Sequence, residues 1–211
     1  MTQLLGKIRQ VKRQSLKRQV AVTAGIIVLG LAVGVLQKWI DGSPGNAFPL
    51  WLQRLDIRNY FGRLAIWILA ATALSVYSES PLRASINTFS FFIGMLAGYY
   101  SYCYFVLGFL PKAYAAVWVI LSVASFFMAY AVWYAKGQGG AAVILSGVIL
   151  GVLFAQAFSV TQSFYVYHGM EAVTWLAGVA VLFRKPKELA AEIGLSFVVA
   201  FLYQLFIPHF G

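Results

Sequence analysis

A histidine and a glutamate lie three residues apart at the start of an apolar run, in the segment YHGMEAVTW (residues 167–175). If this run forms a helix, one face carries a stripe of polar and small residues at spacings of three, three and four: His168, Glu171, Thr174 and Gly178. Inside a membrane, a carboxylate that faces lipid costs about 3 kcal/mol or more. We therefore expect the stripe to face other helices or a wet cavity, with Glu171 as a charged or proton-binding group and His168 as its neighbour.

Other interpretations of this pair stay open. Glu171 could instead be interfacial, or could form a structural ion pair with Arg58 or Arg63. A histidine and a glutamate can bind metal, but zinc needs further ligands, so we predict no metal and no cofactor. Acid–base chemistry by the pair would suit an intramembrane enzyme. That class is the least favoured, because the sequence has no Walker A loop, no G-x-S-x-G and no H-E-x-x-H, and we assign no catalytic residue.

The composition places the pair in a membrane protein. Of the 211 residues, 61% are hydrophobic and 10% are charged, against about 45–50% and 25% in soluble domains. Several apolar runs are long enough for a bilayer core of about 30 Å, which takes about 20 helical residues. Cys103 is the only cysteine, so no intramolecular disulfide can form. The sequence predicts an all-α fold, a polytopic transmembrane helical bundle that occupies residues 20–211 as one domain.

Hydropathy predicts about seven spans, with six as the alternative if the sixth run only dips into the membrane. The predicted spans are residues 20–38, 62–79, 86–110, 113–134, 141–160, 166–183 and 189–207. The longest connection, residues 41–61, begins with glycine and proline and then becomes amphipathic. It is typical of a helix that lies in the outer interface, or of a lid over an outward cavity.

The net charge of +10 gathers mainly at the ends of the apolar runs. Residues 1–19 are basic with apolar residues at helical spacing, which indicates a surface helix on an anionic leaflet. The distribution of lysine and arginine predicts a cytoplasmic N-terminus by the positive-inside rule. A nucleic-acid arm would look similar, but no polar domain carries the charge. We expect the lipid bilayer as the partner and no nucleic acid.

Three predicted spans contain a G-x-x-x-G motif, which allows two helix backbones to approach closely in lipid. The glycines are Gly30 and Gly34, Gly94 and Gly98, and Gly147 and Gly151. These motifs predict a compact bundle. They would serve equally well for packing within the chain, for a homo-oligomer, or for contact with a partner membrane protein.

Polar side chains of four predicted spans fall at one depth, in the outer halves of the third, fifth, sixth and seventh spans. They are Tyr99, Tyr100, Tyr102, Tyr104, Gln156, His168, Glu171, Tyr203 and Gln204. The leading hypothesis is an outward-facing, tyrosine-rich pocket that binds or transports a small solute. The tyrosines could instead form an aromatic belt at the membrane surface. A non-catalytic accessory or scaffold protein that packs against partner helices is the competing function.

The block FGRLAIWILAATALSVYSESPLRASINTFSFFIGMLAGYYSYCYF, followed by GFLPKAY and WYAKG, resembles a family of small multi-pass membrane proteins of bacteria. The likeness covers about residues 60–207, and its most specific piece is YSESPLRASINTFSFFIGM. The resemblance implies a location in the bacterial cytoplasmic membrane. It implies no substrate, activity or site residue, because the family's function is not known.

Overall fold

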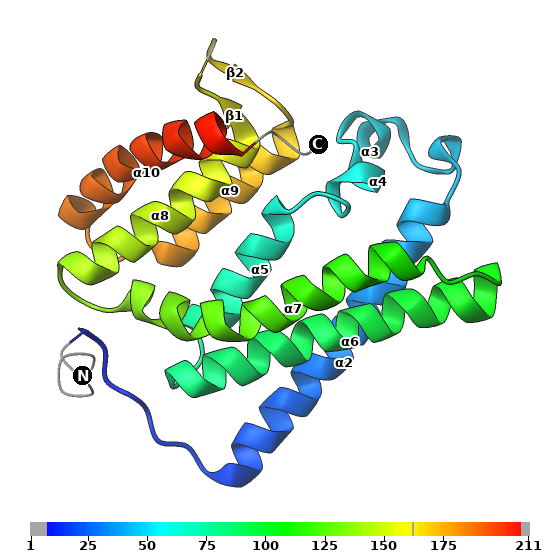
Figure 1. Cartoon of the computed structure of the whole chain (residues 1–211), viewed down its shortest axis with the longest axis horizontal. Coiled ribbons are helices and arrows are strands. Elements are labelled where there is room, and N and C mark those ends of the chain that lie inside the picture. The colour runs from blue at the N-terminus through cyan, green and yellow to red at the C-terminus, as the bar shows by residue number, and fades with distance from the viewer. Residues whose placement is uncertain (1–7, 162, 208–211) are drawn as a thin grey trace.

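The computed structural model describes residues 8–161 and 163–207, and long helices dominate it (Figure 1). Within these ranges, seven helices of 12 or more residues alternate in direction along the chain. They are α2 (Leu16–Gly42), α5 (Ala65–Val76), α6 (Pro81–Leu107), α7 (Lys112–Val132), α8 (Gly140–Ala157), α9 (Gly169–Leu182) and α10 (Pro186–Phe206). The all-α prediction is confirmed, and each long helix lies where the sequence predicts a span.

Five of these helices are long and apolar enough to cross a membrane, namely α2, α6, α7 with its extension to Lys136, α8 and α10. The other two, α5 and α9, have 12 and 14 residues. At about 1.5 Å per residue they are about 18 and 21 Å long, less than the bilayer core of about 30 Å. Seven helices of 12 or more residues are therefore present in the described ranges, whereas seven complete crossings stay a prediction.

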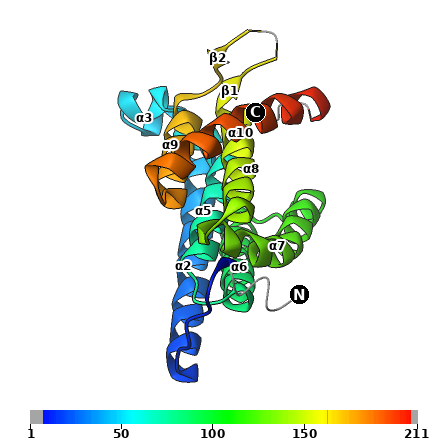
Figure 2. The same ribbon diagram turned by 90° about the vertical axis from the view of Figure 1, so that its left-hand side faces the viewer.

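The two ends of the bundle differ, as Figure 2 shows along its vertical axis. We call one the loop end, because it carries η1 (Gly45–Ala47), α3 (Leu50–Arg54), α4 (Ile57–Tyr60), and the hairpin of β1 (Phe158–Ser159) and β2 (Tyr165–Val166). We call the other the basic end, after the four cations Arg9, Arg83, Lys136 and Arg184. Helices α5 and α9 both begin at the loop end, so their first turns lie beneath the connecting segments.

The connection predicted over residues 41–61 is not one helix. Asp56 has φ 52°, in the left-handed region that aspartate tolerates better than most residues, and it separates α3 from α4. Leu50 and Trp51 of α3 are 71% and 62% exposed, which suits a segment at a membrane interface. The hairpin was not predicted either: the fifth predicted span runs to residue 160, but α8 ends at Ala157 and β1 follows.

The basic N-terminal surface helix, predicted over residues 1–19, does not form across residues 9–15, which have no helical structure; residues 1–7 lie outside the described ranges. Arg9 instead inserts among helix ends. Its guanidinium donates to the carbonyl oxygens of Trp133, at 2.6 Å, and Val76, at 2.7 Å. Val76 is the last residue of α5 and Trp133 is the first residue of η2 (Trp133–Lys136), so Arg9 joins two helix ends. Burial lowers the pKa of Arg9. The N-terminal segment is therefore part of the folded basic end.

Two of the glycine motifs face each other across α2 and α6. A Cβ atom added at Gly34 would overlap the carbonyl oxygen of Met95, and one at Gly98 would overlap that of Leu31. The third motif packs α8 against α10, where Gly147 meets Leu195. All three motifs thus serve contacts within the chain, which is how close backbone approach stabilises helix pairs in lipid.

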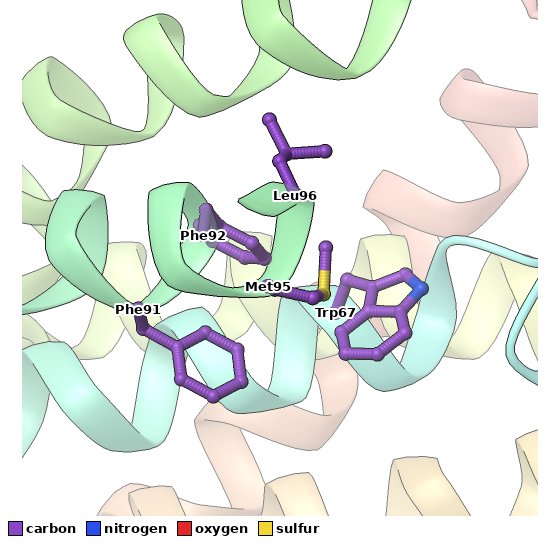
Figure 3. Packing of buried hydrophobic residues seen from close by; sticks show 5 residues of the cluster. All are labelled: Trp67, Phe91, Phe92, Met95 and Leu96. Carbon is purple, nitrogen blue, oxygen red and sulfur yellow. The ribbon is translucent and has the colours of Figure 1, made fainter. Parts of the chain in front are cut away.

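Helix α5 also packs on α6. Trp67 contacts a cluster of buried apolar side chains on α6, made of Phe91, Phe92, Met95 and Leu96. Figure 3 shows Trp67 beside Met95, with Phe91 one turn earlier on the same helix. Helices α5 and α9 are also neighbours, and α9 in turn packs on α8. The chain between Tyr60 and α5 is thereby held against the start of α9.

Candidate functional site

Glu171 lies in the first turn of α9 and is almost completely buried, with 1% of its surface exposed. Its carboxylate forms an ion pair with Arg63, which directly precedes the linker into α5 and is 8% exposed. Of the two arginines that the sequence offers as partners, Arg63 is the one used; Arg58 reaches the carbonyl oxygen of Asp41 at 3.4 Å. Transfer of two charges out of water costs free energy, and a buried ion pair offsets this cost only when further hydrogen bonds satisfy its remaining polar atoms.

Two further contacts tie this ion pair to the loop end. The Arg63 guanidinium also donates to Asp56, with 2.7 Å between Nη1 and Oδ2. The hydroxyls of Tyr60 and Thr174 hydrogen bond at 2.5 Å, one turn along α9 from Glu171. Burial raises the pKa of the Tyr60 hydroxyl, so this hydroxyl stays protonated at neutral pH. We call the group of five residues, Asp56, Tyr60, Arg63, Glu171 and Thr174, the loop-end polar site.

The loop-end polar site contains one unused donor and one unused acceptor. Within residues 8–161 and 163–207, neither Arg63 Nη2 nor Glu171 Oε2 has a hydrogen-bond partner, although both atoms are buried. A buried polar atom without a partner costs about 1–3 kcal/mol, and more when it is charged. A small polar molecule that offers an acceptor to Arg63 and a donor to Glu171 would satisfy both atoms.

Asp56 connects the buried pair to a small pocket at the loop end. The pocket has a volume of about 160 Å³ and is lined by η1, α3 and α4, including Phe48, Gln53 and Asn59. Asp56 lines this pocket and also binds Arg63, and its side chain is 38% exposed. The three charged groups, Asp56, Arg63 and Glu171, sum to one negative charge. The helix dipole places a partial positive charge at the N-terminus of α9, and this charge stabilises the carboxylate of Glu171 in the first turn.

His168 directly precedes α9 in an extended conformation, and its carbonyl oxygen accepts from the amide of Ala172 at 3.3 Å. It thus begins the helix that carries Glu171. The predicted stripe is present on α9: Glu171, Thr174 and Gly178 are all buried there. A Cβ atom at Gly178 would press against Leu153 of α8, so this part of the stripe serves close helix contact.

The predicted tyrosines belong to a different part of the loop end. Tyr99 donates to Asp41 of α2 at 3.3 Å, and the Lys38 ammonium lies 5.2 Å from the centre of the Tyr99 ring. Tyr100 packs edge-on against Tyr99. Tyr102 is half-buried and Tyr104 is 62% exposed on the same helix, which suits an aromatic belt.

A third group joins α8 and α10 beneath the hairpin. Gln156 donates to the Tyr203 hydroxyl at 3.2 Å. Gln204 donates to the carbonyl oxygens of Ala155 and Phe158 and accepts from the amide of Val160. Its side chain therefore replaces backbone partners where α8 gives way to β1. The nine predicted site residues thus fall into three groups, around Tyr99, Gln156 and Glu171, and the contacts of each group run to different helices.

A second buried ion pair, not predicted from the sequence, lies at the basic end. Arg184 pairs with Glu192, which is 1% exposed, and contacts Glu188 at 3.3 Å. The same guanidinium donates to the carbonyl oxygen of Ala135 at 2.8 Å. Glu188 and Glu192 are four residues apart and therefore share one face of α10, and Arg184 lies four residues before Glu188. This spacing was visible in FRKPKE and the residues after it.

Lys136 adds a further contact at the basic end, because its ammonium donates to the carbonyl oxygen of Val181 in the last turn of α9. A charged side chain from another segment therefore contacts α9 near each end: Arg63 pairs with Glu171 at its start, and Lys136 donates to a backbone carbonyl at its finish. Among the described residues, no group of three or more histidine, cysteine or acidic side chains is arranged to hold a metal ion.

No protein-family model matches the chain, and neither curated proteins nor solved structures show a significant similarity to it. The resemblance to small bacterial membrane proteins therefore stays a prediction.

Proposed function

We propose that the chain is an integral membrane protein that binds, and in doing so moves, a small polar solute at the loop-end polar site. Glu171 and Arg63 would hold the solute, and residues 48–64 would act as the cap that admits it. In this proposal the loop end faces outward and the basic N-terminus lies in the cytoplasm of a bacterial cell, in line with the positive-inside rule.

The observation that carries the proposal is the pair of unused buried atoms, Arg63 Nη2 and Glu171 Oε2. A purely structural ion pair gains most when each partner's remaining hydrogen-bonding capacity is satisfied. This pair leaves capacity open on both sides. Glu192 Oε2 at the basic end is also without a hydrogen-bond partner among the described residues, but the loop-end pair lies next to a polar pocket that Asp56 lines. A solute with an acceptor and a donor, such as an amino acid or an amine with a hydroxyl, fits that arrangement.

The lengths of α5 and α9 give further support. Both begin at the loop end and both are shorter than a full span. In many transporters, solute sites are built where interrupted helices present their first turns inside the membrane region. Here the first turn of α9 supplies Glu171, and Arg63 lies just before α5. Opening of the cap would expose this pair without separating the long helices.

The scaffold alternative lacks a comparable observation. Its motivation is the modest polarity within the spans and the lack of an energising domain in the sequence, and its expected contact surface is the glycine motifs. All three motifs are engaged within the chain. A partner membrane protein would have to use a different surface from these glycines.

The proposal is tested by the thermal stability of the purified protein against a panel of ions, amines, amino acids and vitamins at two pH values. A ligand at a hundredfold excess over its dissociation constant stabilises by about 2.7 kcal/mol. For a chain of this size that corresponds to a rise in melting temperature of about 5–10 °C. We expect such a rise for the wild type with at least one compound class.

The control uses the two buried ion pairs. The double variant Arg63→Met/Glu171→Leu is expected to lose the ligand-induced rise, whereas Arg184→Met/Glu192→Leu at the basic end keeps it. A rise that persists in the loop-end double variant would contradict the site. The absence of any rise in the wild type across the panel would contradict the function.

A further inference from the structure

A groove of about 520 Å³ runs between α2 and α5, with α6 as its floor. Its size is within the range of about 300–1,000 Å³ for small-molecule sites. At the loop end the groove is lined by Phe61 and Trp67, and at the basic end by Ser78, Glu79 and Asn87. Figure 3 shows two of the lining side chains, Trp67 of α5 and Phe91 of α6.

Between these ends the walls are apolar. Val22, Ile26 and Leu29 line the groove from α2, and Ala70 and Ala73 line it from α5. A cavity with such walls does not hold water, because water needs two to four polar partners. The small alanine side chains leave the space open along α5. An elongated apolar chain is the ligand chemistry that fits these walls.

The end of the groove near Glu79 is polar and lies among cations. The amide of Lys12 donates to the carbonyl oxygen of Glu79 at 2.9 Å, which places the N-terminal segment across this end. Lys12 and Arg13 have exposed side chains there. Gln14 donates to the Glu79 carboxylate at 2.6 Å, so that carboxylate is partly engaged.

Arg83 adds a cation on the floor of this end. It donates to Asn87, which lines the groove, and to the carbonyl oxygen of Gln19, both at 3.0 Å. Lys12, Arg13 and Arg83 together outweigh the single negative charge of Glu79. The groove thus combines an apolar body with a net positive mouth at one end.

We infer that this groove binds one anionic glycerophospholipid, with an acyl chain between α2 and α5 and the phosphate beside Lys12, Arg13 and Arg83. The charge of the mouth selects the lipid, because each basic residue near an anionic headgroup adds to its attraction. This lipid site is separate from the loop-end polar site, since it opens at the basic end of α5.

Native mass spectrometry of the delipidated protein tests this inference, with phosphatidylglycerol, phosphatidylcholine or diacylglycerol added at equal acyl composition. We expect one phosphatidylglycerol to be retained in preference to the other two. Ala73→Phe fills the groove and is expected to abolish this retention. Ala116→Phe, at an exposed position of α7, is the matched control and is expected to keep it.

The charge of the mouth is tested separately with exposed residues, which should not affect folding. Lys12→Gln with Arg13→Gln is expected to weaken phosphatidylglycerol binding by about thirtyfold and to leave phosphatidylcholine binding unchanged. Retention by Ala73→Phe equal to that of Ala116→Phe would overturn the groove as the site. Equal binding of diacylglycerol and phosphatidylglycerol by the wild type would overturn the role of the headgroup.

Discussion

Replacing Glu171 with leucine is expected to lower the free energy of unfolding by about 3–5 kcal/mol, because it leaves the buried Arg63 without its closest counter-ion. Asp56 stays within 2.7 Å of Arg63, but its own side chain is 38% exposed and cannot replace a carboxylate inside the bundle. The measurement is reversible unfolding of the purified protein in detergent, followed by helical signal.

The matched variant is Arg63→Met in the Glu171→Leu background. Removal of both charges is expected to restore stability to within about 1 kcal/mol of the wild type, since buried ion pairs exchanged for apolar side chains are often neutral or stabilising. A single Glu171→Leu variant as stable as the wild type would contradict the buried pair. Restored stability of the double variant would also separate folding from binding, because this variant would fold but would lack the charged groups of the site.

Replacing Gly34 with leucine is expected to cost about 3 kcal/mol or more, at or above the top of the usual range for overpacking. The added side chain would meet the backbone of Met95 and Tyr99 on α6, and backbone cannot move aside as a flexible side chain can. Helices α2 and α6 would have to separate along the line where both glycine motifs meet. Thermal unfolding of the variant gives the magnitude.

Gly25→Leu is the control for this prediction. Gly25 lies on the same helix nine residues before Gly34, and a Cβ atom there would meet nothing within 4 Å. Leucine at that position is expected to leave stability unchanged or slightly higher, because glycine is a poor helix former. Equal stability of the two variants would contradict the close α2–α6 contact.

The helix positions followed well from the sequence, because apolar runs of this length have few alternatives in a membrane. The sixth run, predicted over residues 166–183, forms α9, and the fifth, predicted over 141–160, forms α8. The sequence also contains a signal for the start of α6. Ser80 accepts from the amide of Arg83 at 3.2 Å, and Pro81 opens the helix, so it begins five residues before the predicted span.

The lateral arrangement could not be predicted, since a topology gives the depth of a residue but not its neighbours. Tyr99 and Glu171 come from spans predicted to reach the same depth, but α6 is drawn to α2 by glycines while α9 lies between α5 and α8. For the same reason, the sequence could not decide between Arg58 and Arg63 as the partner of Glu171. Asp56, at the turn before both arginines, accepts from Arg63, and its positive φ could not be predicted from one sequence.

Whether the loop-end polar site opens to its surroundings can be measured directly, whatever the solute. A single cysteine is placed at Thr174 in a Cys103→Ala background, and a charged thiol reagent is added to the folded protein in vesicles. Thr174 is 2% exposed and bonded to Tyr60, so the closed structure protects it. Ser196→Cys, at a fully buried position of α10, is the control.

We expect the cysteine at position 174 to react in the folded protein while the one at 196 stays unmodified, because the cap over Arg63 and Glu171 opens and the α8–α10 contact does not. If both cysteines react only after unfolding, the ion pair is a permanent strut and the proposed solute site is contradicted.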